Sequence, residues 1–232
     1  MDSGSILTES INIITSLNDD YKNIVLLSLQ VSISAVIISS LISLPLSYLI
    51  AVKKFYLRNI LKIFVNTLLA LPPVVVGLIL YIVFSVNGIL GNLGLLYTVT
   101  AMIIAQFILI TPIIISLSIN SFENYHRKFD QYLISIHANE FQKITTLIFE
   151  SKYDLTMNVL LSFSRALSEV GAIIIVGGNI AYLTRTMTTG IVLETSKGDL
   201  PTALSLGITL LSLALIINIF LAFLRNKNET NN

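Results

Sequence analysis

The stretch RALSEVGAIIIVGG, residues 165–178, places two full charges in a run that otherwise has the composition of a hydrophobic helix. Arg165 and Glu169 are four residues apart, so in a helix they lie on one face and can pair. Each charge alone near the centre of a bilayer would cost roughly 2.5–3.5 kcal/mol on insertion scales, so such residues point into a bundle, pair or line water. Small neighbours such as Ala166 and Gly171 allow other helices to approach closely. The stretch therefore indicates an intramembrane ion pair inside a helical bundle.

The composition of the whole chain supports a membrane location. Of 232 residues, 54% are hydrophobic and 12% are charged, and the mean hydropathy is +0.84. A soluble domain typically carries about 25% charged residues. The absence of cysteine excludes disulfides and thiolate metal sites, and with only His126 and His137 a histidine-rich metal site or proton relay is not expected. The net charge of +1 gives no indication of nucleic acid as a partner.

Five segments of the chain are long and apolar enough to cross a bilayer, for which roughly 20 apolar residues are needed. Residues 5–17 have apolar residues at helical spacing but are too short to span. Residues 1–22 are therefore predicted to form an extracytoplasmic segment with a helix lying in the membrane interface, and no secretory signal peptide is expected. The predicted spans are residues 24–52, 60–85, 95–118, 158–176 and 200–224.

The basic residues of the loops predict the orientation of the chain in the membrane. Ten Lys and Arg residues lie in the loops after the first and third spans and in the C-terminal tail, whereas the opposite side has three. Cytoplasmic loops carry the excess of basic residues. We therefore expect residues 119–157 and the C-terminus in the cytoplasm and the N-terminus outside.

The predicted cytoplasmic loop, residues 119–157, is polar, but apolar residues recur in it at helical spacing. This pattern predicts short amphipathic helices at the cytoplasmic face of the membrane. Either these helices cover the underside of the bundle, or one of them docks into a soluble partner. Periodicity alone does not distinguish the two.

The order of these parts resembles the permease subunit of a type I ABC importer, in which the last large cytoplasmic loop carries a coupling helix that inserts into a groove on the ATPase subunit. The matching stretch is ISIHANEFQKITTLIFE, residues 134–150. His137 stands where that family has a glycine and Glu150 where it has a proline, which changes the expected docking geometry in detail. The resemblance implies that the coupling residues are Ser135, Ile136, His137, Ala138, Asn139, Glu140 and Phe141.

A stronger resemblance lies downstream, in residues 163–199. The elements SEVGA, VGGNI, TRTMTT and LETSKGD of this segment resemble the oxyanion branch of these permeases and look most like the tungstate type, and LPPVVVG, residues 71–77, fits the same group. The resemblance covers roughly residues 21–224. It implies an all-α integral membrane protein with about five transmembrane helices, a permease domain over residues 23–225 and a cytoplasmic tail at 226–232.

This resemblance implies a subunit of the cell membrane that moves tungstate, or a closely similar tetrahedral oxyanion, into the cytoplasm by alternating access. The chain contains no GxxxxGK[ST] stretch, so it would need a separate ATPase. Five spans are few for enclosing a pore, which predicts a homodimer about a two-fold axis. The expected partners are a second copy of the chain, cytoplasmic ABC ATPase subunits, an extracytoplasmic solute-binding protein and membrane lipid, with no cofactor.

Two roles are open for the charged pair of Arg165 and Glu169. It either pins the fourth span against its neighbours or forms a gate that meets the passing oxyanion. We expect the structural role, because a strong cation in the path would hold a dianion too tightly to release it. Hydroxyls and amides beyond the outer end of this span are weaker ligands, which would line an outer pathway, contact the binding protein or simply form turns. They are Asn179, Thr184, Thr186, Thr188 and Thr189.

Other classes of function are weighed against this one. A membrane-embedded enzyme would need convergent catalytic groups, yet the predicted spans hold one Glu, one Arg, no His and no Cys. No catalytic residue and no metal site are therefore expected. A permease for molybdate or sulfate, and a purely structural or sensory membrane subunit, remain as alternatives.

Overall fold

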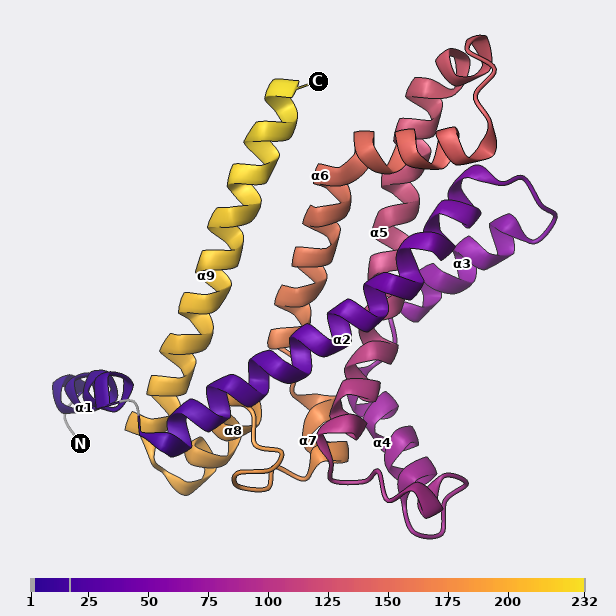
Figure 1. Cartoon of the computed structure of the whole chain (residues 1–232). Helices are drawn as coiled ribbons and strands as arrows, with labels where there is room; N and C mark the ends of the chain where they lie inside the picture. The colour runs from indigo at the N-terminus through magenta and orange to yellow at the C-terminus, as the bar shows by residue number, and fades with distance from the viewer. Residues whose placement is uncertain (1–2, 17, 232) are drawn as a thin grey trace.

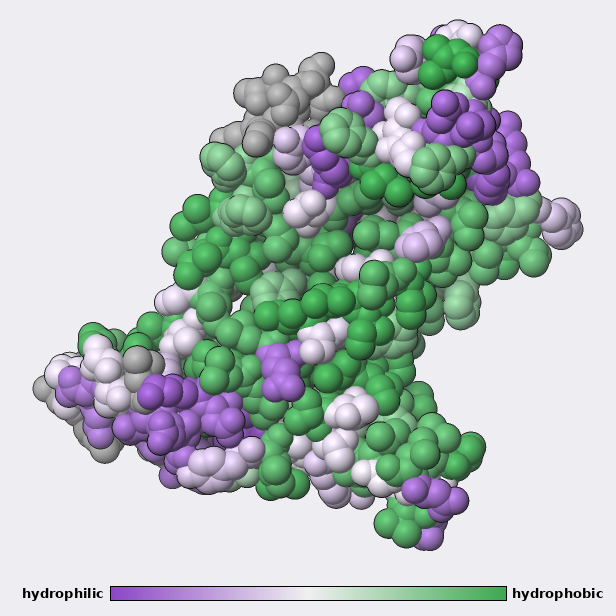
Figure 2. All heavy atoms as spheres, viewed as in Figure 1, coloured by the Kyte–Doolittle hydropathy of each residue, from purple (hydrophilic) through white to green (hydrophobic). Residues whose placement is uncertain are grey.

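The computed structural model describes residues 3–16 and 18–231 and is all-helical over these residues (Figure 1). Figure 2 shows hydrophobic side chains over the middle of the viewed face and polar ones gathered at its two ends, as a membrane-spanning bundle requires. A 3-10 turn, η1, covers Gly91–Leu93. The α-helices are α1 (Ser3–Ser16), α2 (Asp19–Val52), α3 (Arg58–Leu68), α4 (Pro73–Phe84), α5 (Val99–Ser135), α6 (Glu140–Leu167), α7 (Gly171–Gly177), α8 (Met187–Lys197) and α9 (Leu200–Asn231).

Within the described part of the chain, three single helices are long and apolar enough to cross a membrane, namely α2, α5 and α9. The other two predicted spans are bent pairs: α3 and α4 meet at 94°, and α6 and α7 at 57°. The predicted count of five spans holds when each pair counts as one crossing, and the crossings over residues 60–85 and 158–176 are broken rather than continuous helices. In the first pair Pro72 and Pro73 explain the break, because proline cannot continue a helix from its N-terminal side and disfavours helical backbone in the residue before it.

The core of the bundle is the packing of α2 along α5. Three serines of α2 face α5 and donate hydrogen bonds to carbonyl oxygens one turn apart: Ser39 to Phe107 (3.5 Å), Ser43 to Thr111 (3.3 Å) and Ser47 to Ile115 (3.3 Å). All three serines are fully buried. Small hydroxyl side chains let two helix backbones approach closely in lipid, so this stripe is a packing device.

The cytoplasmic loop differs from the sequence prediction. Residues 119–157 do not form separate short helices: α5 continues to Ser135, α6 begins at Glu140, and a four-residue turn joins them. The extension is stable because the apolar face of α5 continues through Phe122 and Tyr125 and packs against Leu147 and Leu155 of α6. Figure 1 shows the first turns of α6 running across the direction of the rest of that helix.

The N-terminal segment forms helix α1 over its described residues, as its helical spacing predicted, and residue 17 lies outside them. Its placement in the membrane interface stays a prediction. Ser10 of α1 is buried and donates a hydrogen bond to the carbonyl of Pro201 (3.0 Å), which holds α1 against the start of α9. Figure 1 places α1 and α8 at one end of the bundle, and the α5–α6 turn and the end of α9 at the other.

Candidate functional site

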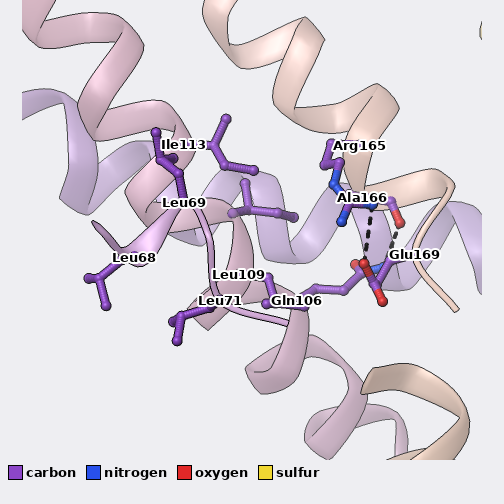
Figure 3. Close-up of a pocket in the computed structure, with 10 residues that line it drawn as sticks. Leu68, Leu69, Leu71, Gln106, Leu109, Ile113, Arg165, Ala166 and Glu169 are labelled. Atoms are coloured by element: carbon purple, nitrogen blue, oxygen red, sulfur yellow. Dashed lines mark hydrogen bonds and ion pairs between the residues drawn. The ribbon is translucent and has the colours of Figure 1, made fainter. Parts of the chain in front are cut away.

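The two breaks in the helices meet at one small cavity of about 40 Å³ (Figure 3). Leucines of the α3–α4 break form one wall of the cavity and α5 forms another. The end of α6 together with Glu169 forms the third. A volume of this size has room for one or a few water molecules. Its lining is Leu68, Leu69, Leu71, Gln106, Leu109, Ile110, Ile113, Arg165, Ala166 and Glu169.

The predicted pair of Arg165 and Glu169 is formed in this cavity, with 3.3 Å between Arg165 Nη1 and Glu169 Oε2. The two side chains are unequally buried: Glu169 is 6% exposed and Arg165 is 49% exposed. The second carboxylate oxygen of Glu169 accepts a hydrogen bond from the backbone N–H of Ala172 (3.3 Å), in the first turn of α7. Glu169 therefore joins α6 to α7 across the break. Whether the pair also acts as a gate remains a prediction.

Gln106 of α5 completes the polar cluster, and the sequence analysis did not single it out. Its amide nitrogen donates to the carbonyl of Ala166 (2.9 Å) and to the hydroxyl of Ser32 (3.4 Å), while its buried Oε1 has no partner among the described residues. An unsatisfied buried acceptor costs about 1–3 kcal/mol, which favours a donor or a water molecule in the cavity. Gln106 is the one carboxamide in the predicted span 95–118, so this isolated polar residue was a readable signal.

The hydroxyl and amide residues predicted beyond the outer end of the fourth span are turned inward. Thr184, Thr186, Thr188 and Thr189 are all buried. Thr184 donates to the carbonyl of Gly177 (2.5 Å), Thr188 donates to that of Glu169 (2.9 Å), and the Asn179 amide donates to that of Thr189 (3.3 Å). In this conformation they fix the segment before α8, and the first turn of α8 itself, onto α7 and the break. A role toward cargo or a binding protein stays a prediction.

The predicted coupling residues form the α5–α6 turn at the opposite end of the bundle from α1. Asn139 caps α6 in a capping box, in which its side chain accepts from the N–H of Gln142 (2.9 Å) and the Gln142 side chain accepts from the N–H of Asn139 (2.9 Å). Ile136 is 52% exposed and Phe141 is 73% exposed, so two large apolar side chains face outward here. The geometry suits a docking surface, and its partner remains a prediction.

Glu140 ties this turn to the end of α2. It forms ion pairs with Lys53, which follows α2, and with Lys143 one turn along α6 (3.2 Å). The hydrogen bond from Lys53 and the one from Lys143 lower the pKa of the Glu140 carboxyl, because both favour its charged form. The lowered pKa keeps the Glu140 carboxylate ionised at neutral pH, so its ion pair with Lys53 links this turn to the end of α2.

His137 adopts a left-handed backbone conformation, with φ of +51°, at the position where the resemblance expects glycine. Its N–H donates to the carbonyl of Ile134 (3.0 Å) and that of Ala138 to Leu133 (3.0 Å), so His137 closes the C-terminal end of α5. A residue other than glycine in this region costs about 1–3 kcal/mol.

We therefore expect His137→Gly to raise the free energy of unfolding by about 0.5–1 kcal/mol, since the relieved strain exceeds the extra entropy glycine loses on folding. The midpoint of unfolding by denaturing detergent measures this. The matched control is His126→Gly within α5, where glycine should lower the midpoint. A His137→Gly midpoint below the wild-type value would contradict the assignment.

The comparison with known families identifies the class of protein that this fold and site form. The family described as "Binding-protein-dependent transport system inner membrane component" matches residues 43–229. The chain belongs to this family: it is a multi-pass permease component of the inner membrane in a binding-protein-dependent transporter, and ATP hydrolysis is the task of a separate subunit.

Individual relatives narrow this class. The tungstate uptake system permease protein TupB of Campylobacter jejuni is 42% identical over 165 residues, which are 71% of this chain and 69% of the relative. TupB of Peptoclostridium acidaminophilum is 38% identical over 209 residues, 90% and 92% of the two chains. A probable anion ABC transporter permease protein of Haloferax volcanii is 34% identical over 215 residues, 90% and 93% of the two chains.

Proposed function

We propose that this chain is the permease subunit of an ATP-driven importer for tungstate or a closely similar tetrahedral oxyanion. The observation that carries the proposal is the 38% identity to a tungstate permease over 90% of the chain. An external binding protein delivers the anion, and the bundle passes it to the cytoplasm by alternating between outward and inward openings.

The polar cluster at the two helix breaks supports this function. A conduit for a dianion needs groups that replace its water weakly, since tight binding prevents release. The cavity offers the Gln106 amide, and its cation Arg165 is already opposed by Glu169. The breaks beside it divide two crossings into segments that meet at an angle, and hinges of this kind absorb a change between two openings.

The proposed assembly has two copies of the chain, because one copy has too few crossings to enclose a pathway. The N-terminus lies outside and the C-terminus in the cytoplasm, as the basic residues of the loops indicate. ATPase subunits dock on residues 135–141, and the binding protein docks at the opposite end, near α1 and α8.

Reconstitution in proteoliposomes with the ATPase subunit and the binding protein tests this proposal. We expect ATP hydrolysis to rise several-fold on addition of tungstate-loaded binding protein. Phe141→Ala should abolish the rise, because this 73% exposed side chain lies on the proposed docking surface. The matched control is Phe149→Ala in the same helix, 64% exposed but outside residues 135–141, which should retain it.

Three results would each contradict a part of the proposal. If no loaded binding protein stimulates hydrolysis, the importer function fails. If sulfate stimulates hydrolysis and tungstate does not compete with it, the proposed cargo is wrong. If Phe141→Ala and Phe149→Ala behave alike, the docking surface is misplaced.

A further inference from the structure

A basic pocket lies between the C-terminal end of α2 and the second half of α5, apart from the polar cluster at the helix breaks. Its volume is about 260 Å³, which is room for several water molecules at about 30 Å³ each. We propose that this pocket binds a tetrahedral oxyanion, and that the phosphate of an anionic phospholipid headgroup is the one it holds. The lining residues are Ala51, Val52, Lys54, Arg58, Glu123, His126 and Arg127.

The charges of the pocket are unbalanced. Three cationic side chains, Lys54, Arg58 and Arg127, line it together with one carboxylate, Glu123. That carboxylate is already engaged, because its Oε1 accepts from Arg58 Nη2 (2.7 Å) and also pairs with Lys62 just outside the lining. A net positive charge therefore remains in this hollow, and a concentration of one sign of charge attracts an anion.

Two of the cations are free to bind a ligand. Lys54 and Arg127 are exposed and make no hydrogen bond or ion pair with any residue that the structure describes. Arg58, in contrast, is fixed: its Nε donates to the carbonyl of Ile50 (2.8 Å) and its Nη2 also reaches that of Ala51. The pocket thus has one preorganised guanidinium and two free cations beside it, and arginine and lysine are the side chains that bind phosphate oxygens.

His126 supplies a further polar group in the lining. Its Nδ1 is buried and has no hydrogen-bond partner among the described residues, while its Nε2 lies 3.9 Å from Asp130 Oδ1. A buried ring nitrogen without a partner is unusual, because most buried polar atoms are paired. In the tautomer that carries its hydrogen on Nδ1, an oxyanion in the pocket would accept a hydrogen bond from this nitrogen.

The surroundings of the pocket favour a lipid as the source of the phosphate. Ala51 and Val52 are the last residues of the apolar helix α2, so the pocket lies where the hydrocarbon region ends. Helix α3 then directs Lys62 toward Glu123 and exposes Ile60 (58%), Ile63 (67%) and Phe64 (58%). Exposed apolar side chains next to cations at this depth suit acyl chains below a headgroup, and basic pockets between helices on the cytoplasmic side bind anionic headgroups.

Titration of the purified full chain in a neutral detergent tests the proposal. The probes are a short-chain phosphatidylglycerol, a short-chain phosphatidylcholine, inorganic phosphate and tungstate. Lys54→Gln with Arg127→Gln removes the two free cations without breaking a contact. The matched control, Lys22→Gln with Lys197→Gln, removes two exposed cations at the other end of the bundle.

We expect phosphatidylglycerol to bind the wild type and the control double variant equally, and the Lys54→Gln, Arg127→Gln variant about thirtyfold more weakly. This factor follows from about 1 kcal/mol for each basic residue near an anionic headgroup, at about 1.4 kcal/mol per tenfold. Weak competition by inorganic phosphate and tungstate would identify the lipid as the source. Tight binding of either free anion, lost in the same variant, would support the oxyanion site with a soluble source.

The proposed site is overturned if phosphatidylglycerol binds the Lys54→Gln, Arg127→Gln variant with the same affinity as the wild type. It is also overturned if phosphatidylcholine binds with the same affinity as phosphatidylglycerol and this affinity is the same in the wild type and the variant. The choice of the cytoplasmic leaflet rests on the orientation proposed above. The binding measurement itself needs no cargo, ATPase or binding protein, so its failure and the failure of the importer function are separate results.

Discussion

Replacing Gly77 with valine is expected to prevent the packing of α4 against α7 and to leave little correctly folded protein in the membrane. A Cβ atom at Gly77 would lie 2.8 Å from the Cα and 3.1 Å from the carbonyl oxygen of Ala172. Both of these are backbone atoms, which cannot turn aside as a side chain would. Overpacking typically costs about 1–3 kcal/mol, and a clash with backbone that two methyl groups enlarge should cost at least the upper value.

A second glycine lies at the same helix contact. Gly171 at the start of α7 lies against Val74 in the first turn of α4, and a Cβ added at Gly171 would be 2.8 Å from Val74 Cγ2. These small residues hold the second halves of both broken spans together. Separating them would also open the cavity at the breaks. We therefore expect loss of stimulated ATP hydrolysis together with loss of the folded state.

Gly207→Val is the matched control, since a Cβ at Gly207 in α9 meets nothing within 4 Å. It places the same side chain in another membrane-spanning helix. The fraction of monodisperse protein after extraction and the midpoint of unfolding by denaturing detergent are the measurements. Similar values for Gly77→Val and Gly207→Val would show that the close approach of α4 and α7 does not limit stability.

The sequence predicted the positions of the membrane crossings better than the conformation of the helices within them. Runs of apolar residues set the five crossings, but hydropathy measures length and polarity and does not detect a bend. Pro72 and Pro73 were a readable signal, because proline is favoured at the first position of a helix and here opens α4. At the second break, residues 168–170 carry no proline, and the bend depends on the contacts that Glu169 and Gly171 make with other segments.

At the helical hairpin of α5 and α6 the sequence analysis predicted separate short helices where the structure has two long ones. Residues 119–157 contain no glycine and no proline, so nothing in the sequence marks the end of a helix until Asn139, which caps α6. The same apolar periodicity fits two short helices or one long one. His137 conceals the turn because it replaces the glycine that would have marked the left-handed position.

For the candidate site, spacing alone predicted that Arg165 and Glu169 pair. The meeting of residues 68–71 with Gln106 and this pair joins segments nearly 100 residues apart, and only the packing of α5 between the two breaks brings them together. The burial of the threonines was also not predictable from local pattern. Thr188 and Thr189, in the first turn of α8, have the same sequence signal whether their hydroxyls face water or a backbone carbonyl.

The last prediction concerns the charged pair. Arg165→Met is expected to lower the free energy of unfolding more than Glu169→Gln does. Removing the arginine leaves a carboxylate that is 6% exposed without a cation, whereas glutamine at 169 can still accept the hydrogen bond from Ala172 and leaves Arg165 half exposed. Breaking a buried pair from one side costs about 3–5 kcal/mol, and the exposure of Arg165 places the expected loss near the lower end. The double variant should lose less free energy of unfolding than the sum of the losses in Arg165→Met and Glu169→Gln. The difference, the coupling energy of the pair, should be at least about 1 kcal/mol.

A double-mutant cycle compares two single variants with the double variant. The control is such a cycle on Asp19 and Lys22, an exposed pair 3.7 Å apart in the first turn of α2, and its coupling energy should be near zero. Measuring unfolding and stimulated ATP hydrolysis on the same proteins separates the two roles of Arg165 and Glu169. A pair that only pins α6 to α7 predicts that the double variant recovers both stability and activity relative to Arg165→Met. A gate predicts recovered stability without recovered activity, because the anion would then have lost groups that it meets in passing. We expect recovery of both stability and activity, since the carboxylate is turned toward the start of α7 and already pairs with Arg165, the cation among the described residues of the cavity lining.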